Sequence, residues 1–273
     1  MSFFRCPVCQ NSLTEKNHSL VCANRHCFDI ARQGYVNLLR PGGYGVRRHG
    51  DDKCMVSSRT AFLDAGFYDP LRDAVARLAV CCSKNGDTLL DAGCGEGFYT
   101  SFIRKTLEDA GRAVSVYGID VSRDAILACA ARDRKIGLAV ASISAIPIAD
   151  SSVNLLINLF APFDAAEFSR VMVPGGTLLR VFPDRRHLWE LKEAIYDSPY
   201  ENHIGTLALD GFSLISEQKL NFSFQLTNNE QITSLFQMTP YYYKTSREDQ
   251  EKLSRLHNIT VTAEFILVKY QKP

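Results

Sequence analysis

The chain has 273 residues, of which 46% are hydrophobic and 22% are charged, as in an ordinary folded globular protein. Its sequence contains no apolar stretch near the ~20 residues that a membrane-spanning helix requires, and the N-terminus lacks the apolar segment of a secretory signal. The nine cysteines do not have the regular spacing of a disulfide framework. We therefore expect a cytoplasmic protein in a reducing compartment, with no membrane partner.

The charge is unevenly distributed along the chain. The total is only +1, but residues 1–60 hold nine Lys or Arg and four Asp or Glu, a net charge of +5. Such a basic segment is typical of a surface that contacts a polyanion, although a solvated basic face would give the same charge.

The first forty residues carry the spacing of a metal site. Cys6 and Cys9 form a CxxC pair, Cys22 follows after twelve intervening residues, and His26 after three more. Two such pairs supply the four ligands of a tetrahedral zinc ion, with no open position for catalysis. Zinc would also stabilise a segment too short to bury a large core. Cys27 could replace His26 as the fourth ligand, and a redox or free-thiol pair is the alternative interpretation.

Residues 41–80 are predicted to hold a linker followed by two helices. The stretch 41–52 is polar, basic and rich in glycine, as linkers and mobile loops are. Apolar residues then recur at helical spacing from Met55, and a second helix is predicted to start at Tyr68, with Pro70 in its first turn.

The segment Leu89–Phe98 is a predicted strand, glycine-rich turn and helix start. Asp91 ends the strand, and Gly93, Gly95 and Gly97 follow at a spacing of two. Glycine permits positive φ and close approach of a ligand to the backbone, and the helix N-terminus beyond favours an anionic group. This GxGxG pattern resembles the first motif of class I S-adenosylmethionine (SAM) methyltransferases, in which the turn wraps the methionine end of SAM.

Two later segments extend this predicted cofactor site. The strand 113–119 ends in Asp120, whose carboxylate can accept hydrogen bonds from both ribose hydroxyls, although it could merely cap the helix that starts near Ser122. The strand Leu138–Ile143 follows, and its last residues, Ser142 and Ile143, are expected to border the adenine.

The rest of the chain alternates between strand and helix patterns. Such alternation predicts a parallel sheet with helices on both faces, hence an α/β, Rossmann-like fold. The predicted strands are 88–92, 113–119, 138–143, 153–160 and 177–182, and the helices are 99–109, 123–134, 165–171 and 186–196. An antiparallel strand is predicted at 212–226, helices at 230–237 and 247–257, and a last antiparallel strand at 260–270, at the edge of the sheet.

The combination of a Cys–His module with a SAM motif closely resembles the bacterial 23S rRNA (guanine-N1)-methyltransferase family of the RlmA type. The resemblance runs nearly from end to end, and its more specific segments lie outside the glycine motif. The matching segments are CPVC at 6–9, the Cys22–His26 knuckle, GYVNLL at 34–39, RTAFLDAGFYDPLRDA at 59–74, DAGCGEGFYT at 91–100, GIDVS at 118–122, VPGG at 173–176, RHLWELK at 186–192 and QMTP at 237–240.

The resemblance implies an enzyme that methylates N1 of one guanine, of the guanine 745 type, in a hairpin of 23S rRNA, with a homodimer as the assembly. It implies zinc ligation by Cys6, Cys9, Cys22 and His26. It also implies SAM contacts from Tyr68, Gly97, Phe98 and His187, with Phe98 standing where a relative has tyrosine. The predicted organisation is a zinc-binding RNA-recognition module at 1–40, a linker and N-terminal helices at 41–80, and a SAM-dependent methyltransferase domain at 81–273.

The sequence does not identify a general base for the guanine N1 proton. Asp164 and Asp184 follow predicted strands, but helix capping is the simpler interpretation of each. The segment Asn158–Pro162 lacks the Pro-Pro pair of exocyclic-amine methylases, which disfavours transfer to an amino group. Phe160 within it could stack on a flipped base or simply pack in the core, and the tyrosines at 241–243 leave the same two alternatives open.

Two other functions share some of these features. A small-molecule methyltransferase could use its zinc ribbon for protein contact, and a non-catalytic module could bind both SAM and RNA without transferring a methyl group. Both would retain the glycine turn and Asp120.

Overall fold

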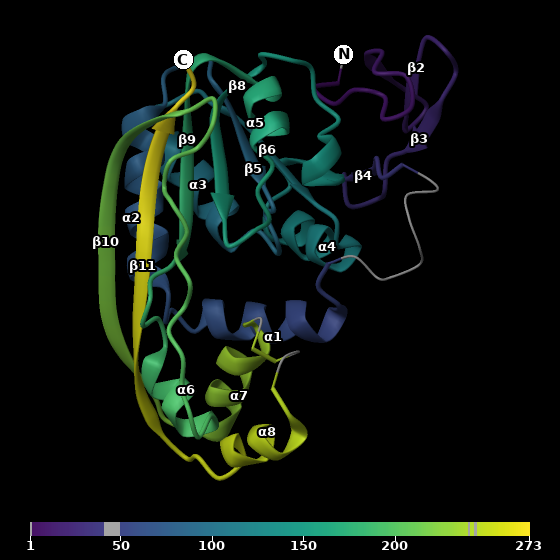
Figure 1. Cartoon of the computed structure of the whole chain (residues 1–273). Helices are drawn as coiled ribbons and strands as arrows, with labels where there is room; N and C mark the ends of the chain where they lie inside the picture. Colours follow the sequence, from purple (N-terminus) through teal and green to yellow (C-terminus); the bar gives the residue numbers. More distant parts are fainter. Residues whose placement is uncertain (1, 41–49, 240, 243–244) are drawn as a thin grey trace.

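The computed structural model describes residues 2–40, 50–239, 241–242 and 245–273. Most of the predicted linker, at 41–49, therefore lies outside the described residues. An eight-stranded sheet forms the centre of the molecule, in the order β10-β11-β9-β8-β5-β6-β7-β4 (Figure 1). Its strands are β4 (Val36–Asn37), β5 (Thr88–Ala92), β6 (Ser115–Asp120), β7 (Gly137–Val140), β8 (Val153–Leu159), β9 (Met172–Pro183), β10 (Ser213–Leu226) and β11 (Ile259–Gln271).

The sheet is parallel from β4 to β9 and antiparallel where β11 joins β9 and β10. The central strand β8 has the sequence VNLLINL and is buried at almost every position, as expected for a parallel strand covered on both faces. Because parallel strands share one direction, the loops after β5, β6, β7 and β8 open at the same edge, where ligands bind in such sheets.

Helices cover both faces of this sheet and extend beyond its carboxyl edge. The helices are α1 (Lys53–Asp64), α2 (Asp69–Cys82), α3 (Phe98–Asp109), α4 (Arg123–Arg132), α5 (Ala165–Val171), α6 (Trp189–Ile195), α7 (Asn229–Gln237) and α8 (Arg247–Leu253), with a short 3-10 helix η1 (Ile143–Ala145). One hydrophobic core joins α2, α3 and α4 to the sheet, and a second joins α5 and the N-terminal segment to it. Figure 1 shows α1 lying across the space between the sheet and the group α6–α8.

The N-terminal segment is built onto the main sheet. Its own antiparallel sheet consists of β1 (Leu13–Lys16), β2 (Ser19–Cys22) and β3 (Cys27–Asp29). The Phe3 ring stacks on Tyr117 of β6 at a centroid distance of 3.9 Å, Phe4 forms a β-bridge with Ile148, and β4 pairs with β7. The predicted domain boundaries at 40 and 80 remain a prediction, but this segment supplies the outermost strand of the large sheet.

Two predicted elements differ from the structure. The third strand ends at Val140, and Ile143 belongs to η1, because the Ser142 hydroxyl accepts a hydrogen bond from the Ser144 amide (3.3 Å) and diverts the backbone from the sheet. The last strand, β11, is not at the sheet edge, since β10 covers its outer side. The continuous apolar run 265–268 in β11 fits an interior strand, whereas most of β10 is exposed.

Helix boundaries shift by a few residues elsewhere. The helix predicted at 186–196 begins at Trp189, because Leu188 has a positive φ of 55° at its N-cap. The helix predicted at 247–257 ends at Leu253. Within the described ranges, no helix has both the length and the apolar character to cross a membrane.

Candidate zinc and cofactor sites

The four predicted zinc ligands meet in one cluster. Their ligand atoms all lie within 4.8 Å of one another. The His26 Nδ1 atom is 3.5 Å from the Cys6 sulfur and 3.4 Å from the Cys22 sulfur, and the sulfurs of Cys9 and Cys22 are 3.6 Å apart. Tetrahedral zinc with bonds of about 2.0–2.3 Å places its ligands roughly 3.5–3.8 Å apart. Three thiols and one imidazole at this spacing therefore fit a structural zinc ion.

Two tight turns present these ligands. Each turn contains a residue with positive φ, Gln10 (φ 60°) directly after Cys9 and Arg25 (φ 64°) directly before His26. The Gln10 amide donates to the Cys6 carbonyl (2.8 Å), and the Arg25 amide donates to the Cys22 carbonyl (2.9 Å). Cys27 is exposed on β3 and is not part of the cluster.

The glycine turn after β5 has the conformation that the sequence predicts. Gly93, Gly95 and Gly97 have φ values of 94°, 54° and 82°. A Cβ on Gly93 would lie 2.3 Å from the Ala161 Cβ, and one on Gly97 would lie 2.4 Å from the Cys129 sulfur. These two glycines allow close contact with the β8 loop and with α4, whereas the Cβ position of Gly95 faces the Arg59 guanidinium at 3.7 Å.

Asp91 is a buried carboxylate at the start of this turn. One of its oxygens accepts a hydrogen bond from the Thr100 hydroxyl (2.6 Å), and the other, Oδ1, is buried without a hydrogen-bond partner among the described residues. Burial raises the pKa of Asp91 to about 7. A buried acceptor of this kind, beside a turn of three glycines, suits the α-ammonium or sulfonium group at the methionine end of SAM.

Asp120 lies across the turn from Asp91. Its two oxygens accept hydrogen bonds from the amides of Gly95 (3.1 Å) and Ser122 (2.8 Å), so it holds the glycine turn and the start of α4 together. The separate prediction that Asp120 merely caps α4 is not what is seen, because the Ser122 hydroxyl itself caps that helix at Ala125. Each Asp120 oxygen keeps acceptor capacity for a ribose hydroxyl.

An ion pair between α1 and the residue before its N-cap lies next to this part of the site. The Arg59 guanidinium pairs with Asp51, whose carbonyl accepts a hydrogen bond from the Ser122 hydroxyl (2.7 Å). Arg59 also faces the carboxylates of Glu96 and Asp120, which raise its pKa against the opposing effect of its burial. Nothing in the local sequence pattern distinguishes Arg59 from any other helical arginine, so its place beside Asp120 is visible only in the folded chain.

Tyr68 and His187 meet although 119 positions separate them in the chain. The Tyr68 hydroxyl lies 3.4 Å from His187 Nε2, and both side chains are buried. The His187 Nδ1 lies 3.0 Å from the Glu264 carbonyl oxygen and 3.1 Å from the Glu264 amide nitrogen of β11. Burial lowers the pKa of His187 to about 3, so this imidazole is neutral at physiological pH.

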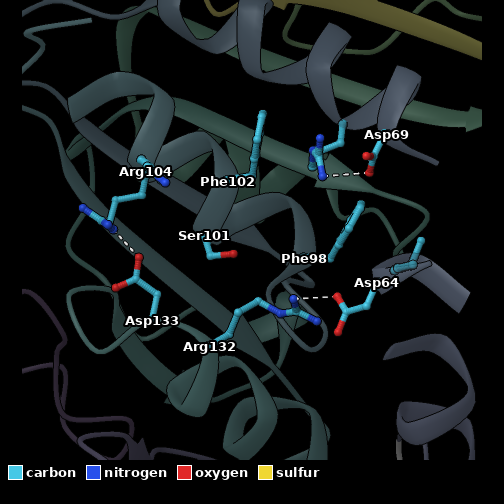
Figure 2. A pocket seen from close by; sticks show the side chains of 11 residues that line it. Asp64, Asp69, Phe98, Ser101, Phe102, Arg104, Arg132 and Asp133 are labelled. Carbon is cyan, nitrogen blue, oxygen red and sulfur yellow. Dashed lines mark hydrogen bonds and ion pairs between the residues drawn. The ribbon is translucent and has the colours of Figure 1, made fainter. Parts of the chain in front are cut away.

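Three further predicted cofactor residues, Ser142, Ile143 and Phe98, lie around the glycine turn. Ile143 borders Gly93, with its Cδ1 atom 3.6 Å from the position of a Gly93 Cβ, and Ser142 precedes it at the end of the β7 segment. Phe98 begins α3 directly after Gly97, which fits a backbone contact. Its ring, however, points into a separate cavity of about 440 Å³ (Figure 2).

This cavity lies between α2, α3 and α4 and is lined by charged residues. Figure 2 shows Arg132 paired with Asp64 (2.8 Å) at one side and Arg104 paired with Asp133 at another. Among the ten predicted cofactor residues, all of them described, only Phe98 lines the cavity. The other nine predicted cofactor residues therefore lie outside this cavity.

The candidate bases named from the sequence are engaged in other contacts. The Asp164 carboxylate accepts from the Glu167 amide (3.0 Å) and so caps α5, as its capping interpretation predicts. Asp184 is buried, and it pairs with the Lys219 ammonium (2.8 Å) and accepts from the Arg185 amide (2.7 Å). Of the tyrosines at 241–243, Tyr241 is buried and donates to Asn202 (3.2 Å), and Tyr243 lies outside the described residues.

Comparisons with known proteins match both parts of the chain. A family model described as "RlmA, N-terminal" covers residues 4–41, and one described as "Methyltransferase domain" covers residues 83–238. The 23S rRNA (guanine(748)-N(1))-methyltransferase of Streptomyces fradiae is 31% identical over 98% of this chain and 96% of its own. YxjB of Bacillus subtilis (strain 168), which its name places among the 23S rRNA (guanine-N(1)-)-methyltransferases, is 31% identical over 96% of this chain and 95% of its own.

A solved structure shows the same fold at lower identity. The complex of the Haloferax volcanii Trm112 methyltransferase activator with a methyltransferase contains a chain 17% identical to this one, with a TM-score of 0.50. The match covers 84% of this chain and all of that one. At this identity the likeness concerns the fold alone.

Fold and sites together define a SAM-dependent methyltransferase with an N-terminal zinc ribbon, which confirms the predicted fold class and the predicted cofactors, SAM and zinc. The two near-full-length relatives then make the family specific. The chain belongs to the 23S rRNA (guanine-N(1))-methyltransferases, the family predicted from its sequence.

Proposed function

We propose that this enzyme transfers a methyl group from SAM to N1 of a single guanine in a hairpin of 23S rRNA. The observation that carries the proposal is the near-full-length similarity to rRNA (guanine-N1)-methyltransferases, which includes the zinc ribbon as well as the catalytic domain. A small-molecule methyltransferase could use a zinc ribbon for protein contact, but the names of both near-full-length relatives specify rRNA as the substrate.

We assign the zinc ion to Cys6, Cys9, Cys22 and His26, because their donor atoms fit a tetrahedron and Cys27 is turned to solvent. All four positions are filled by protein, so the zinc ion is structural. It would hold the basic N-terminal turns in the shape that contacts RNA.

We assign the cofactor to the carboxyl edge of β5, β6 and β7. In this proposal Asp91 and the turn at Gly93, Gly95 and Gly97 receive the methionine end. Asp120 receives the ribose. The remaining predicted contacts are Ser142 and Ile143 at the adenine, the Phe98 backbone, and the pair Tyr68 and His187.

Most of the catalysis is expected to come from positioning. When bound, SAM would supply a methyl group already activated on a sulfonium, so the chain has to hold N1 in line with that carbon. The N1 proton must leave before or during the transfer, and S-adenosylhomocysteine is the other product. Burial raises the pKa of each of the carboxyl groups of Asp91, Asp120 and Glu96, so a cationic donor bound beside them would favour their ionised forms and be favoured by them in turn. The neutral His187 adds no opposing positive charge.

The exact guanine is a separate part of the proposal. The resemblance implies guanine 745, whereas the name of the Streptomyces fradiae relative specifies guanine 748. We propose guanine 745 and treat guanine 748 as the alternative that the experiment below distinguishes. A homodimer and a cytoplasmic location also remain predictions.

The experiment is methyl transfer from radiolabelled SAM to 23S rRNA from a strain that lacks this modification. We expect label in the RNA and a primer-extension stop at one guanine, because N1-methylation blocks the Watson–Crick edge. A stop at 748 instead of 745 would change the position, and label only in a small-molecule extract would contradict the RNA substrate. SAM binding with no transfer to any acceptor would instead favour the non-catalytic module.

A further inference from the structure

Phe160 is an exposed aromatic residue held in an unfavourable backbone conformation. It follows β8 directly, has a positive φ of 58°, and leaves 45% of its surface exposed. For a bulky side chain such a φ is a true outlier. Strain of this kind persists where the surrounding structure enforces it, and it concentrates at functional sites. A ring that served only for core packing would be buried and would not need this conformation.

The neighbouring backbone fixes this conformation from both sides. The Phe160 amide donates to the Val181 carbonyl of β9 (3.1 Å). The side-chain amide of the buried Asn158 donates to the carbonyls of Ala92 (3.1 Å) and Pro162 (2.9 Å), and these bonds join the β8 loop to the end of β5. The Phe160 ring is therefore presented by a rigid loop at the carboxyl edge of the sheet.

The ring stands between the two halves of the proposed cofactor site. On one side it lies 6.3 Å from the ring of Tyr99, which follows the glycine turn on α3. On the other side it lies 5.5 Å from Phe265, whose ring contacts His187 (4.7 Å) and Tyr68 (5.3 Å). The Phe160 ring therefore lies close both to the start of α3 and to the pair Tyr68 and His187.

We propose that the exposed face of Phe160 stacks on the target guanine and holds its N1 toward the methyl donor. This inference rests on the proposed function, because it requires an RNA base as the acceptor. A paired or stacked guanine hides N1, so the base must leave its stack, and an aromatic side chain can replace the lost stacking. Phe160 then contributes directly to guanine binding without exchanging a proton.

The first test compares Phe160→Leu, which keeps an apolar side chain, with Phe160→Tyr, which keeps an aromatic face. Stacking of a base on an aromatic ring is worth enough to predict a roughly 5- to 150-fold loss of kcat/KM for RNA in Phe160→Leu. We expect the Kd for SAM to stay within twofold and Phe160→Tyr to stay near wild type. Phe160→Leu within threefold of wild type, or an equal loss in Phe160→Tyr, would overturn the proposal.

The matched control is Phe102→Leu. Phe102 lies on α3 in the cavity of Figure 2, where its ring stacks against the Arg72 guanidinium at 3.9 Å. The same substitution there removes an aromatic contact away from the β8 loop, and we expect kcat/KM for RNA to remain within twofold. A loss equal to that of Phe160→Leu would show that the effect is a general loss of side-chain packing and would contradict the proposal.

A second measurement uses the wild-type enzyme and so does not depend on how a variant folds. A hairpin with 6-thioguanosine at the target position is irradiated in the presence of enzyme and S-adenosylhomocysteine, and the adduct is mapped by mass spectrometry. We expect the crosslink on the peptide that contains Phe160, and an adduct confined to other peptides would overturn the inference. Failure of wild-type enzyme to methylate the unmodified hairpin would count against the proposed function instead.

Discussion

The zinc cluster and the cofactor site are built in opposite ways. All four proposed zinc ligands lie between Cys6 and His26, on two neighbouring turns whose hydrogen bonds are local. The residues of the proposed cofactor site run from Tyr68 to His187 and are brought together by the folded chain. The first site therefore depends on one ion, whereas the second depends on the whole fold. A substitution in the first should act mainly on the N-terminal segment, whereas one in the second should act on the methyltransferase fold and its cofactor binding.

The two regions are nevertheless in contact. The N-terminal segment stacks Phe3 on Tyr117 of β6 and pairs β4 with β7, and β6 and β7 are the strands that lead to Asp120 and Ser142. The four predictions below take the zinc cluster first and then the proposed cofactor site.

The largest effect is expected for Cys9→Ala. Removal of one thiolate should release the zinc ion, since structural zinc supplies folding energy outright. Measured zinc should fall from about one ion per chain to near zero, and amide hydrogen exchange should lose its protection in β1–β3. Cys27→Ala is the control, because its exposed thiol lies outside the cluster, and it should keep its zinc. Zinc loss in Cys27→Ala instead would refute the choice of His26.

Asp120→Ala tests the proposed contact of Asp120 with the ribose of SAM. Loss of hydrogen bonds to a charged group costs about 1–3 kcal/mol, so the Kd for SAM measured by calorimetry should rise roughly 5- to 150-fold. Asp124→Ala, an exposed acid in the first turn of α4, provides the control and should change the Kd by less than threefold. Equal Kd values in wild type and Asp120→Ala would remove Asp120 from the cofactor site.

Arg59→Met tests the ion pair between Arg59 of α1 and Asp51, next to the proposed cofactor site. The substitution leaves Asp51 and the neighbouring carboxylates without their cation, and we expect a loss of about 1–3 kcal/mol in the free energy of unfolding in urea. In a double-mutant cycle, Asp51→Asn should cost less in the Arg59→Met background than in the wild type. Strict additivity of the two substitutions would show that the ion pair is not coupled.

His187→Gln tests the buried imidazole through pH. The pKa of His187 is about 3 in the folded chain against 6.5 in an unfolded one, so the unfolded state binds the proton first as pH falls. The wild type should lose up to ~1.4 kcal/mol of stability per pH unit between about 6.5 and 3 from this group. Urea unfolding of His187→Gln should show a smaller loss across that window, whereas His203→Gln, an exposed control, should follow the wild type. Parallel curves for all three would contradict a buried, neutral imidazole.

Sequence alone predicts the local features well. The spacing of Cys6, Cys9, Cys22 and His26 predicts a cluster that forms, and the GxGxG turn has its three positive φ values, because short-range geometry determines both. The parallel pairing of the strands around β8 agrees with their alternation with helices along the chain.

The long-range contacts could not be derived in this way. Tyr68 and His187 were named only through family resemblance, and Arg59 was missed, because its partner Asp51 and its neighbours Glu96 and Asp120 come together only in the folded chain. The edge position expected for β11 was wrong for a related reason. The apolar run 265–268 fits an interior strand, but no local signal says that β10 returns on its outer side.

The short strand β4 has a consequence for how this protein behaves without metal. It completes the sheet beside β7 with Val36–Asn37 and the Leu38 amide, which donates to the Val140 carbonyl (2.9 Å). If the metal-free segment detaches, β7 becomes a bare edge with unpaired amides and carbonyls, a template for pairing with other chains. Protein produced under zinc starvation should therefore precipitate, which makes metal supply during expression a matter of solubility as well as activity.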